Sequence, residues 1–194
     1  MKYLNLNFAL LFFTIFIQFI QVGLTQHLPE GWFRAGSHPE NYMMGPGSSG
    51  YVKSIPSVEF PYSYGTLIQS FFPKAYLGKR VRLSGFVKSN NVTGWAGLLM
   101  RVDTLSKLYL DTMYRRPITG NNDWTVYEDV LEVPIIATKL TFGISLVGEG
   151  EVWLDECKFE IVDPTKVNLT ELTAADGGVE ASPNALQEPI NLSF

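Results

Sequence analysis

The chain has 194 residues, enough for one domain with terminal extensions. Hydrophobic residues make up 46% of it, aromatic residues 13% and charged residues 18%, a balance that favours a folded sheet protein over a disordered chain. The formal net charge is −4, so the composition lacks the basic surplus of a nucleic-acid-binding protein.

Residues 1–25 are predicted to be a secretory signal peptide. Lys2 is the only charge ahead of an apolar run from Phe8 to Ile20, and small or mild residues lead to a predicted cleavage near Thr25. The alternative is a membrane anchor, but glutamines interrupt the run and a spanning helix needs about 20 apolar residues. We therefore expect the protein to be secreted, periplasmic or at the cell surface, with no stable membrane anchor after cleavage.

Residues 26–162 are predicted to form one β-domain. Short alternating segments spaced by Gly, Pro and Asn are typical of a sandwich or barrel, and this region has no helical periodicity. Asn90–Gly94 predicts a turn between two strands, and Gly148–Gly150 predicts a tight hairpin. The expected strands are Gly65–Phe72, Lys79–Ser89, Trp95–Asp103, Lys107–Met113, Trp124–Val133, Lys139–Val147 and Glu151–Val162.

Alternation assigns one face of several strands to the core. Trp124 and Trp153 lie in strands of aliphatic alternation, so we expect both of them in the core as well. Cys157 is the only cysteine, which excludes an internal disulfide, and it is expected to be a buried, inert thiol. The other predicted core positions are Val81, Leu83, Gly85, Val87, Ala96, Leu98, Met100, Val102, Leu140, Phe142, Ile144 and Leu146.

Residues 163–194 are predicted to be a flexible acidic tail or linker. They hold five acids and one base, so the rest of the chain is close to neutral. They contain no aromatic residue before Phe194, and such a segment buries too little apolar surface to order itself.

Four phrases carry a resemblance to a known fold. They are GTLIQSFFPKAYLGKRVRLSGFVKS, GWAGLLMRVD, LYLDTMYRRPITGNNDW and LVGEGEVWLDECKFEIV. In this order they resemble galactose-binding-like jelly-roll domains, which are related to carbohydrate-binding modules. The bacterial domains of this kind are appended to exported enzymes and to some transcriptional regulators. The resemblance covers about Glu30 to Val162 and implies an all-β, antiparallel jelly-roll sandwich, without specifying a ligand.

The resemblance also implies an opening strand that this chain lacks at its expected place. Related domains begin with such a strand before a segment like Pro29–Trp32, which here follows the predicted signal peptide almost directly. The final residues, 189–194, look like an opening strand instead. Either they begin a further module, which we favour, or the tail returns to fill the empty strand position at an entropic cost.

The non-core face of the central strands is the candidate binding surface. Sugar recognition uses flat aromatic rings against the apolar face of the pyranose, with planar polar groups for its hydroxyls. The alternative is a packing role, in which Arg101 and Asp111 form an ion pair beneath a loop and Trp95 closes the sandwich edge. The candidate residues are Trp95, Arg101, Tyr109, Asp111, Arg82, Phe86 and Gln69.

A structural calcium ion is the one cofactor that the sequence raises. In several galactose-binding-like modules an acid on the last strand helps to bind calcium together with an early loop. Asp155 matches the acid in place, and Glu40 or Asn41 is the loop candidate. No local calcium-loop spacing supports this site, so it rests on the resemblance.

Catalysis has no support in the sequence. There is no GxSxG, HExxH or Cys–His pairing, and Glu128 and Asp129 are adjacent, so in a strand they point to opposite faces. We therefore predict a non-catalytic exported binding module, carbohydrate-binding-like and accessory. The alternative is a structural or protein-interaction module of a larger exported enzyme. A sensory domain of a transcriptional regulator is disfavoured, because the chain has neither a helix-turn-helix pattern nor a basic patch.

Overall fold

The computed structural model describes residues 27–55, 63–170, 172–180 and 182–194. The predicted signal peptide lies outside these residues. Within them, no helix is long and apolar enough to cross a membrane. The strands are β1 Trp32–Gly36, β2 Tyr42–Gly45, β3 Gly50–Ser54, β4 Tyr64–Phe71, β5 Lys79–Asp103, β6 Lys107–Asp111, β7 Ile118–Val133, β8 Lys139–Val147, β9 Glu151–Val162 and β10 Thr173–Asp176, with short 3-10 helices at Pro39–Asn41 and Lys74–Tyr76.

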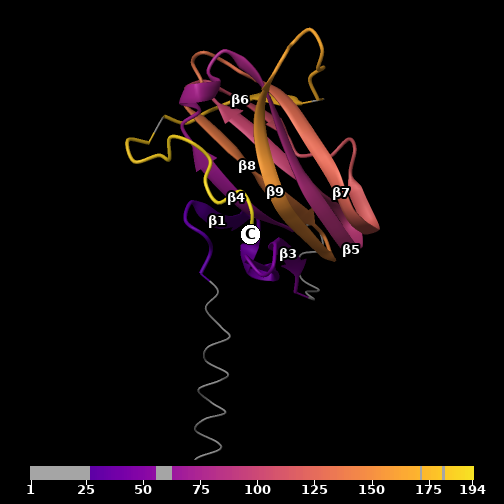
Figure 1. Cartoon of the computed structure of the whole chain (residues 1–194). Helices are drawn as coiled ribbons and strands as arrows, with labels where there is room; N and C mark the ends of the chain where they lie inside the picture. The colour runs from indigo at the N-terminus through magenta and orange to yellow at the C-terminus, as the bar shows by residue number, and fades with distance from the viewer. Residues whose placement is uncertain (1–26, 56–62, 171, 181) are drawn as a thin grey trace, which may run out of the picture.

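The described strands form one continuous antiparallel sheet that folds over into two layers (Figure 1). The first layer has the order β1-β4-β8-β5-β6-β10, and the second has the order β7-β5-β9-β3-β2. The all-β sandwich predicted from the alternating segments is confirmed at this level. Strands β1, β2, β3 and β10 were not predicted, because they are only four or five residues long.

Strand β5 belongs to both layers. Its residues 79–92 pair with β7 and β9, whereas its residues 95–103 pair with β8, and the last of these also with β6. The predicted turn at Asn90–Gly94 is therefore wrong: the chain bends there without reversing. Asn91 takes the left-handed φ of 52°, and the register with β7 shifts three times between Val87 and Ala96. Turn-forming residues thus make bulges that carry one strand from layer to layer.

The core lies between the layers and confirms the predicted faces of β5 and β8. Leu98, Met100, Phe142 and Ile144 are among its fully buried residues, and Cys157 is buried as predicted. Burial raises the pKa of the Cys157 thiol to about 12, which makes the reactive thiolate scarce.

Two tryptophans predicted for the core lie on the outward face instead. Trp124 is 41% exposed, and Trp153 is half-buried on the outer side of β9. Trp153 alternates with the buried Val152 and Leu154, so the pleat turns it away from the core, whereas Trp124 lies in a part of β7 where residues 123–126 are all exposed. The core tryptophan is Trp32, which meets Phe142 edge-on with ring centroids 5.3 Å apart.

The described residues of the 163–194 segment run along the sandwich, as the yellow end of the chain in Figure 1 shows. β10 pairs with β6, and the buried Gln69 amide donates to Ile190 O (2.9 Å) and accepts from Ile190 N (2.8 Å). Phe194 packs on Trp32 with ring centroids 4.9 Å apart. The predicted linker therefore follows a defined path here, and its last residues return to the sheet, as in the less favoured alternative. Backbone and amide hydrogen bonds hold it, together with Leu186, Leu192 and Phe194, which pack against the core.

Candidate functional site

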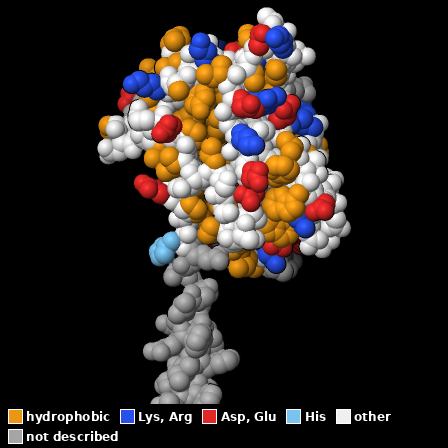
Figure 2. All heavy atoms as spheres, viewed as in Figure 1, with side chains coloured by type: hydrophobic (Ala, Val, Ile, Leu, Met, Phe, Trp, Pro, Cys, Tyr) orange, Lys and Arg blue, Asp and Glu red, His pale blue; other side chains and the backbone are white. Residues whose placement is uncertain are grey.

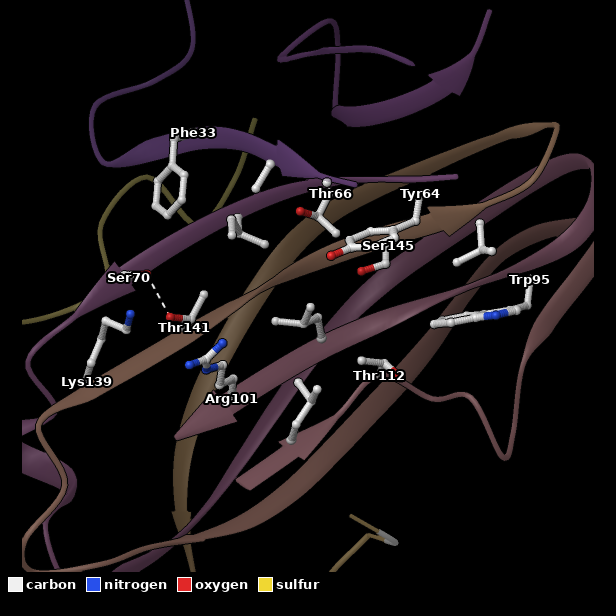
Figure 3. Close-up of a pocket in the computed structure, with 16 residues that line it drawn as sticks. Phe33, Tyr64, Thr66, Ser70, Trp95, Arg101, Thr112, Lys139, Thr141 and Ser145 are labelled. Carbon is white, nitrogen blue, oxygen red and sulfur yellow. Dashed lines mark hydrogen bonds between the residues drawn. The ribbon is translucent and has the colours of Figure 1, made fainter. Parts of the chain in front are cut away.

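The outward face of the first layer is hollowed into a cavity of about 430 Å³. This volume is within the range of small-molecule sites, roughly 300–1,000 Å³. Figure 3 shows side chains from β1, β4, β5 and β8, and from the end of β6, projecting into it. The lining residues are Phe33, Ala35, Gly36, Tyr64, Thr66, Ile68, Ser70, Trp95, Leu99, Arg101, Leu110, Thr112, Lys139, Thr141, Ser145 and Val147.

Aromatic rings form the walls of the cavity. Phe33 and Tyr64 are each 42% exposed, and Trp95 stands at one end, where its ring meets that of Tyr114 edge-on at 6.0 Å. Gly97 allows the β6–β7 loop, which carries Tyr114, to approach: a Cβ there would lie 2.7 Å from a backbone oxygen of that loop. The walls thus present exposed aromatic surface of the kind that accepts the apolar face of a ring ligand.

Hydroxyl groups form the floor of the cavity. Antiparallel pairing of β4 with β8 sets Thr66 opposite Ser145 and Ser70 opposite Thr141. Ser70 and Thr141 share a hydrogen bond of 2.7 Å (Figure 3). Ser145 is only 3% exposed, yet its Oγ has no hydrogen-bond partner among the described residues. A buried hydroxyl without a partner costs stability, so Ser145 is a polar group that a ligand can satisfy.

Two cations stand at the end of the cavity away from Trp95. Arg101 and Lys139 both line it (Figure 3), and both pair with Asp103, which is fully buried. Arg101 donates from Nε (3.0 Å) and Nη2 to Asp103, whereas Lys139 Nζ is 3.7 Å from Asp103 Oδ2. One carboxylate therefore holds two cations, and the accessible charge at this end is positive.

A buried ion cluster anchors the loop that supports the Trp95 end. Asp111 accepts from Met113 N (2.7 Å) and from Arg116 Nη2 (2.6 Å), and Arg116 also pairs with Asp129 of β7. Burial, and then the charge of Asp111, raises the pKa of Asp129 to about 7, although the arginine opposes this shift. The cluster joins β6 of the first layer to β7 of the second and fixes the loop that carries Tyr114.

The structure divides the predicted binding residues. Trp95 and Arg101 do line the cavity. Tyr109 and Asp111 face the other way, because Leu110 and not its neighbours points outward from β6; Tyr109 packs on the core. The expected Arg101–Asp111 ion pair is absent: Arg101 pairs with Asp103, and Asp111 with Arg116.

Three predicted residues lie elsewhere. Gln69 faces inward and holds the C-terminal tail. Arg82 and Phe86 lie on the outer face of the second layer, where Arg82 pairs with Glu160 and Glu128. Figure 2 shows this face with basic and acidic side chains interleaved. A sandwich has two outward faces, and the predicted binding surface combined residues from both of them.

Most of the residues that line the cavity were missed, and four of them show why. Phe33 lies on the unpredicted strand β1, and Tyr64 lies just before the strand predicted from Gly65. Thr66 and Ser145 occupy the non-core positions of β4 and β8, so the alternation that placed Phe142 and Ile144 in the core would have found Ser145.

The candidate calcium ligands have other contacts in the structure. Asp155 Oδ1 accepts from Glu156 N (2.8 Å) and Phe194 N (3.1 Å). Glu40 Oε1 lies 3.1 Å from His38 Nδ1. Among the described residues, no group of three or more His, Cys, Asp or Glu is arranged to hold a metal ion. The calcium site remains a prediction.

Comparison with known proteins gives one sequence relative. No family model matches the chain. A Bacillus subtilis (strain 168) protein, named the uncharacterized HTH-type transcriptional regulator YbfP, is 41% identical over 175 residues. The match covers 85% of this chain and 56% of that protein, so the chain spans little more than half the length of this relative.

Solved structures similar to this chain include carbohydrate-binding modules, the class that the sequence resembles. The CBM22-1 xylan-binding domain of Paenibacillus barcinonensis Xyn10C is 13% identical with a TM-score of 0.48, over 70% of this chain and 88% of that one. The family 29 module CBM29_1 from Piromyces equi is 16% identical with a TM-score of 0.36, over 67% and 80%. At these identities and TM-scores the similarity concerns the fold alone and does not identify a ligand.

Proposed function

We propose that this protein is a non-catalytic binding module whose cavity takes a carbohydrate. The observation that carries the proposal is the buried, unpartnered hydroxyl of Ser145 on the floor of an aromatic-walled cavity. A sugar ring has an apolar face for Tyr64 or Trp95 and hydroxyl edges for Thr66 and Ser145. The cavity size suits a mono- or disaccharide or the end of a longer chain.

The chemistry of the lining favours binding over hydrolysis. Glycoside hydrolysis generally requires a pair of carboxyl groups that flank the scissile bond. The described residues that line the cavity include no acid and no histidine. Asp103, the acid that pairs with the two lining cations, is fully buried and held by Arg101.

The proposal extends to export as an accessory domain. Its support is the apolar run from Phe8 to Ile20, which has the composition of a signal peptide. Expression in a bacterial host, followed by N-terminal sequencing of the product outside the cytoplasm, tests this part. Processing near Thr25 is expected, whereas an intact N-terminus on protein retained in the cytoplasm would contradict export.

A sensory domain of a longer regulator is the second candidate. The 41% identity to the protein named an HTH-type regulator favours it, although the sequence had led us to disfavour this role. In both cases the cavity binds a small ligand, and the two candidates differ in location. Cytoplasmic retention together with glycan binding would favour the sensor over the exported module.

Paired variants of the full chain test the carbohydrate proposal. Ser145→Ala should weaken the binding of a glycan identified on an array about tenfold, as expected for one lost hydrogen bond. Its free energy of unfolding should stay unchanged or rise by about 1 kcal/mol, because the orphaned hydroxyl is gone. Trp95→Ala should weaken binding to a similar extent. The matched controls are Ser84→Ala and Trp124→Ala, both on the outer face of the second layer.

Two results would overturn the proposal. One is that no glycan on the array binds the wild-type chain. The other is that Ser145→Ala and Trp95→Ala bind the glycan as tightly as their controls while remaining folded by circular dichroism.

A further inference from the structure

The cavity has a cationic end although the protein as a whole is acidic. The chain has a formal charge of −4, yet the charged residues that line the cavity are Arg101 and Lys139, with no acid among the described lining residues. Figure 3 shows their side chains projecting into the same end. Among the described residues, the carboxylate that pairs with both cations is that of Asp103, which is fully buried and cannot meet a ligand.

Both cations keep donors available. Arg101 uses Nε and Nη2 on Asp103, and its Nη1 has no hydrogen-bond partner among the described residues. The Lys139 ammonium makes only a long contact, 3.7 Å, to Asp103. Asp103 also restrains the guanidinium in one orientation, since three hydrogen bonds join the two side chains. A held guanidinium with a free amino group suits a planar carboxylate.

The order of the side chains along the cavity suits an extended ligand. The hydroxyls of Ser70 and Thr141 adjoin the cationic end, Thr66 and Ser145 follow, and Trp95 closes the far end (Figure 3). A neutral sugar would meet the hydroxyl floor and the rings but would leave the cations to water.

We propose that the sugar bound here is acidic: a uronic acid residue whose carboxylate meets Arg101 and Lys139 while its ring lies over the hydroxyl floor. This inference rests on the proposed carbohydrate-binding function and names the class of sugar. Any further residues of the glycan would extend toward Trp95.

Calorimetric titration of the full chain with matched sugars tests this proposal. One probe is a galacturonic acid trisaccharide, and its partner is the same trisaccharide with each carboxyl group reduced to a hydroxymethyl group. A glucuronic acid oligosaccharide and its reduced form make a second pair. We expect the acidic member of at least one pair to bind about tenfold more tightly, as a charge-assisted hydrogen bond allows. Its affinity should fall with added salt, whereas that of the neutral member should not.

Variants assign the preference to the cations. Lys139→Gln should reduce the preference for the acidic sugar severalfold and leave the affinity for the neutral sugar unchanged, and Lys139→Arg should restore the preference. The double variant R101Q/D103N removes Arg101 without leaving a buried carboxylate unpaired, and it should reduce the preference in the same way. Lys88→Gln, on the second layer beside Asp123, is the control and should change nothing.

The outcomes separate the two proposals. Equal affinity for the acidic and neutral members of both pairs would overturn the acidic-sugar inference while supporting carbohydrate binding. A Lys139→Gln variant that keeps the full preference for the acidic sugar would also overturn the inference. Binding of neither member of either pair, with no other glycan bound on the array, would overturn the proposed function and this inference with it.

Discussion

Asp129 is the group whose ionisation should control the stability of this protein near neutral pH. Its side chain is fully buried, and its Oδ2 has no hydrogen-bond partner in the described part of the chain. It shares Arg116 with Asp111, so two carboxylates have a single guanidinium. Burial first, and Asp111 second, raise the pKa of Asp129 from 3.8 to about 7.

The size and sign of the effect follow from this pKa. Between pH 3.8 and about pH 7, the folded state holds a proton on Asp129 that the unfolded state has released. The free energy of unfolding therefore falls as the pH rises through that window, by at most about 1.4 kcal/mol per pH unit. Asp129 should make the protein about 2–3 kcal/mol less stable at pH 8 than at pH 5.

Urea unfolding of Asp129→Asn across pH 5 to 8 measures this contribution. The amide keeps the shape of the side chain and has no charge to bury, so the variant should be about 2 kcal/mol more stable than the wild type at pH 8. At pH 5 the two should be nearly equal. Asp123→Asn is the matched control, because Asp123 lies on the same strand and its side chain is 89% exposed. A difference between wild type and Asp129→Asn that does not change with pH would refute the reasoning.

Two further predictions concern the C-terminal tail and the thiol. Deleting residues 189–194 removes Phe194 from Trp32 and both hydrogen bonds from Gln69, so the free energy of unfolding should fall by about 2–4 kcal/mol. A shortened chain that unfolds at the same urea concentration as the full one would show that the tail contributes nothing. Cys157, buried and with its pKa raised to about 12, should react with a thiol reagent at pH 8 only in the urea-unfolded chain. Prompt labelling of the native protein would contradict this.

Strand periodicity predicted the core well where both faces of a strand differ clearly. In β8, Leu140, Phe142, Ile144 and Leu146 alternate with polar or small residues, and all four are fully buried. The same rule places Trp153 outward, since Val152 and Leu154 on either side of it point inward. The prediction that Trp153 lies in the core is wrong because it followed the apolar character of the strand and not the position of the residue in the pleat.

The candidate site was predicted in part, for reasons of geometry. Trp95 and Arg101 lie on one strand at positions of equal parity, so the sequence places both on the cavity side of β5. Tyr109 and Asp111 share a parity too, but nothing in a single strand says which parity faces outward, and β6 turns them toward the core. Phe33 reaches the cavity through the pairing of β1 with β4, and Tyr64 through the pairing of β4 with β8.

The sequence by itself determined which face of β5 and of β8 has to leave water. It specified the all-β class, the buried faces of β5 and β8 and the inert cysteine, because alternation and burial depend on neighbours along the chain. Only the tertiary structure decided that β5 serves both layers, that the tail binds Gln69 and that Ser145, Arg101 and Lys139 meet in one cavity. These features join residues far apart in the chain, and strand register and the bend of β5, which a local pattern does not specify, bring them together.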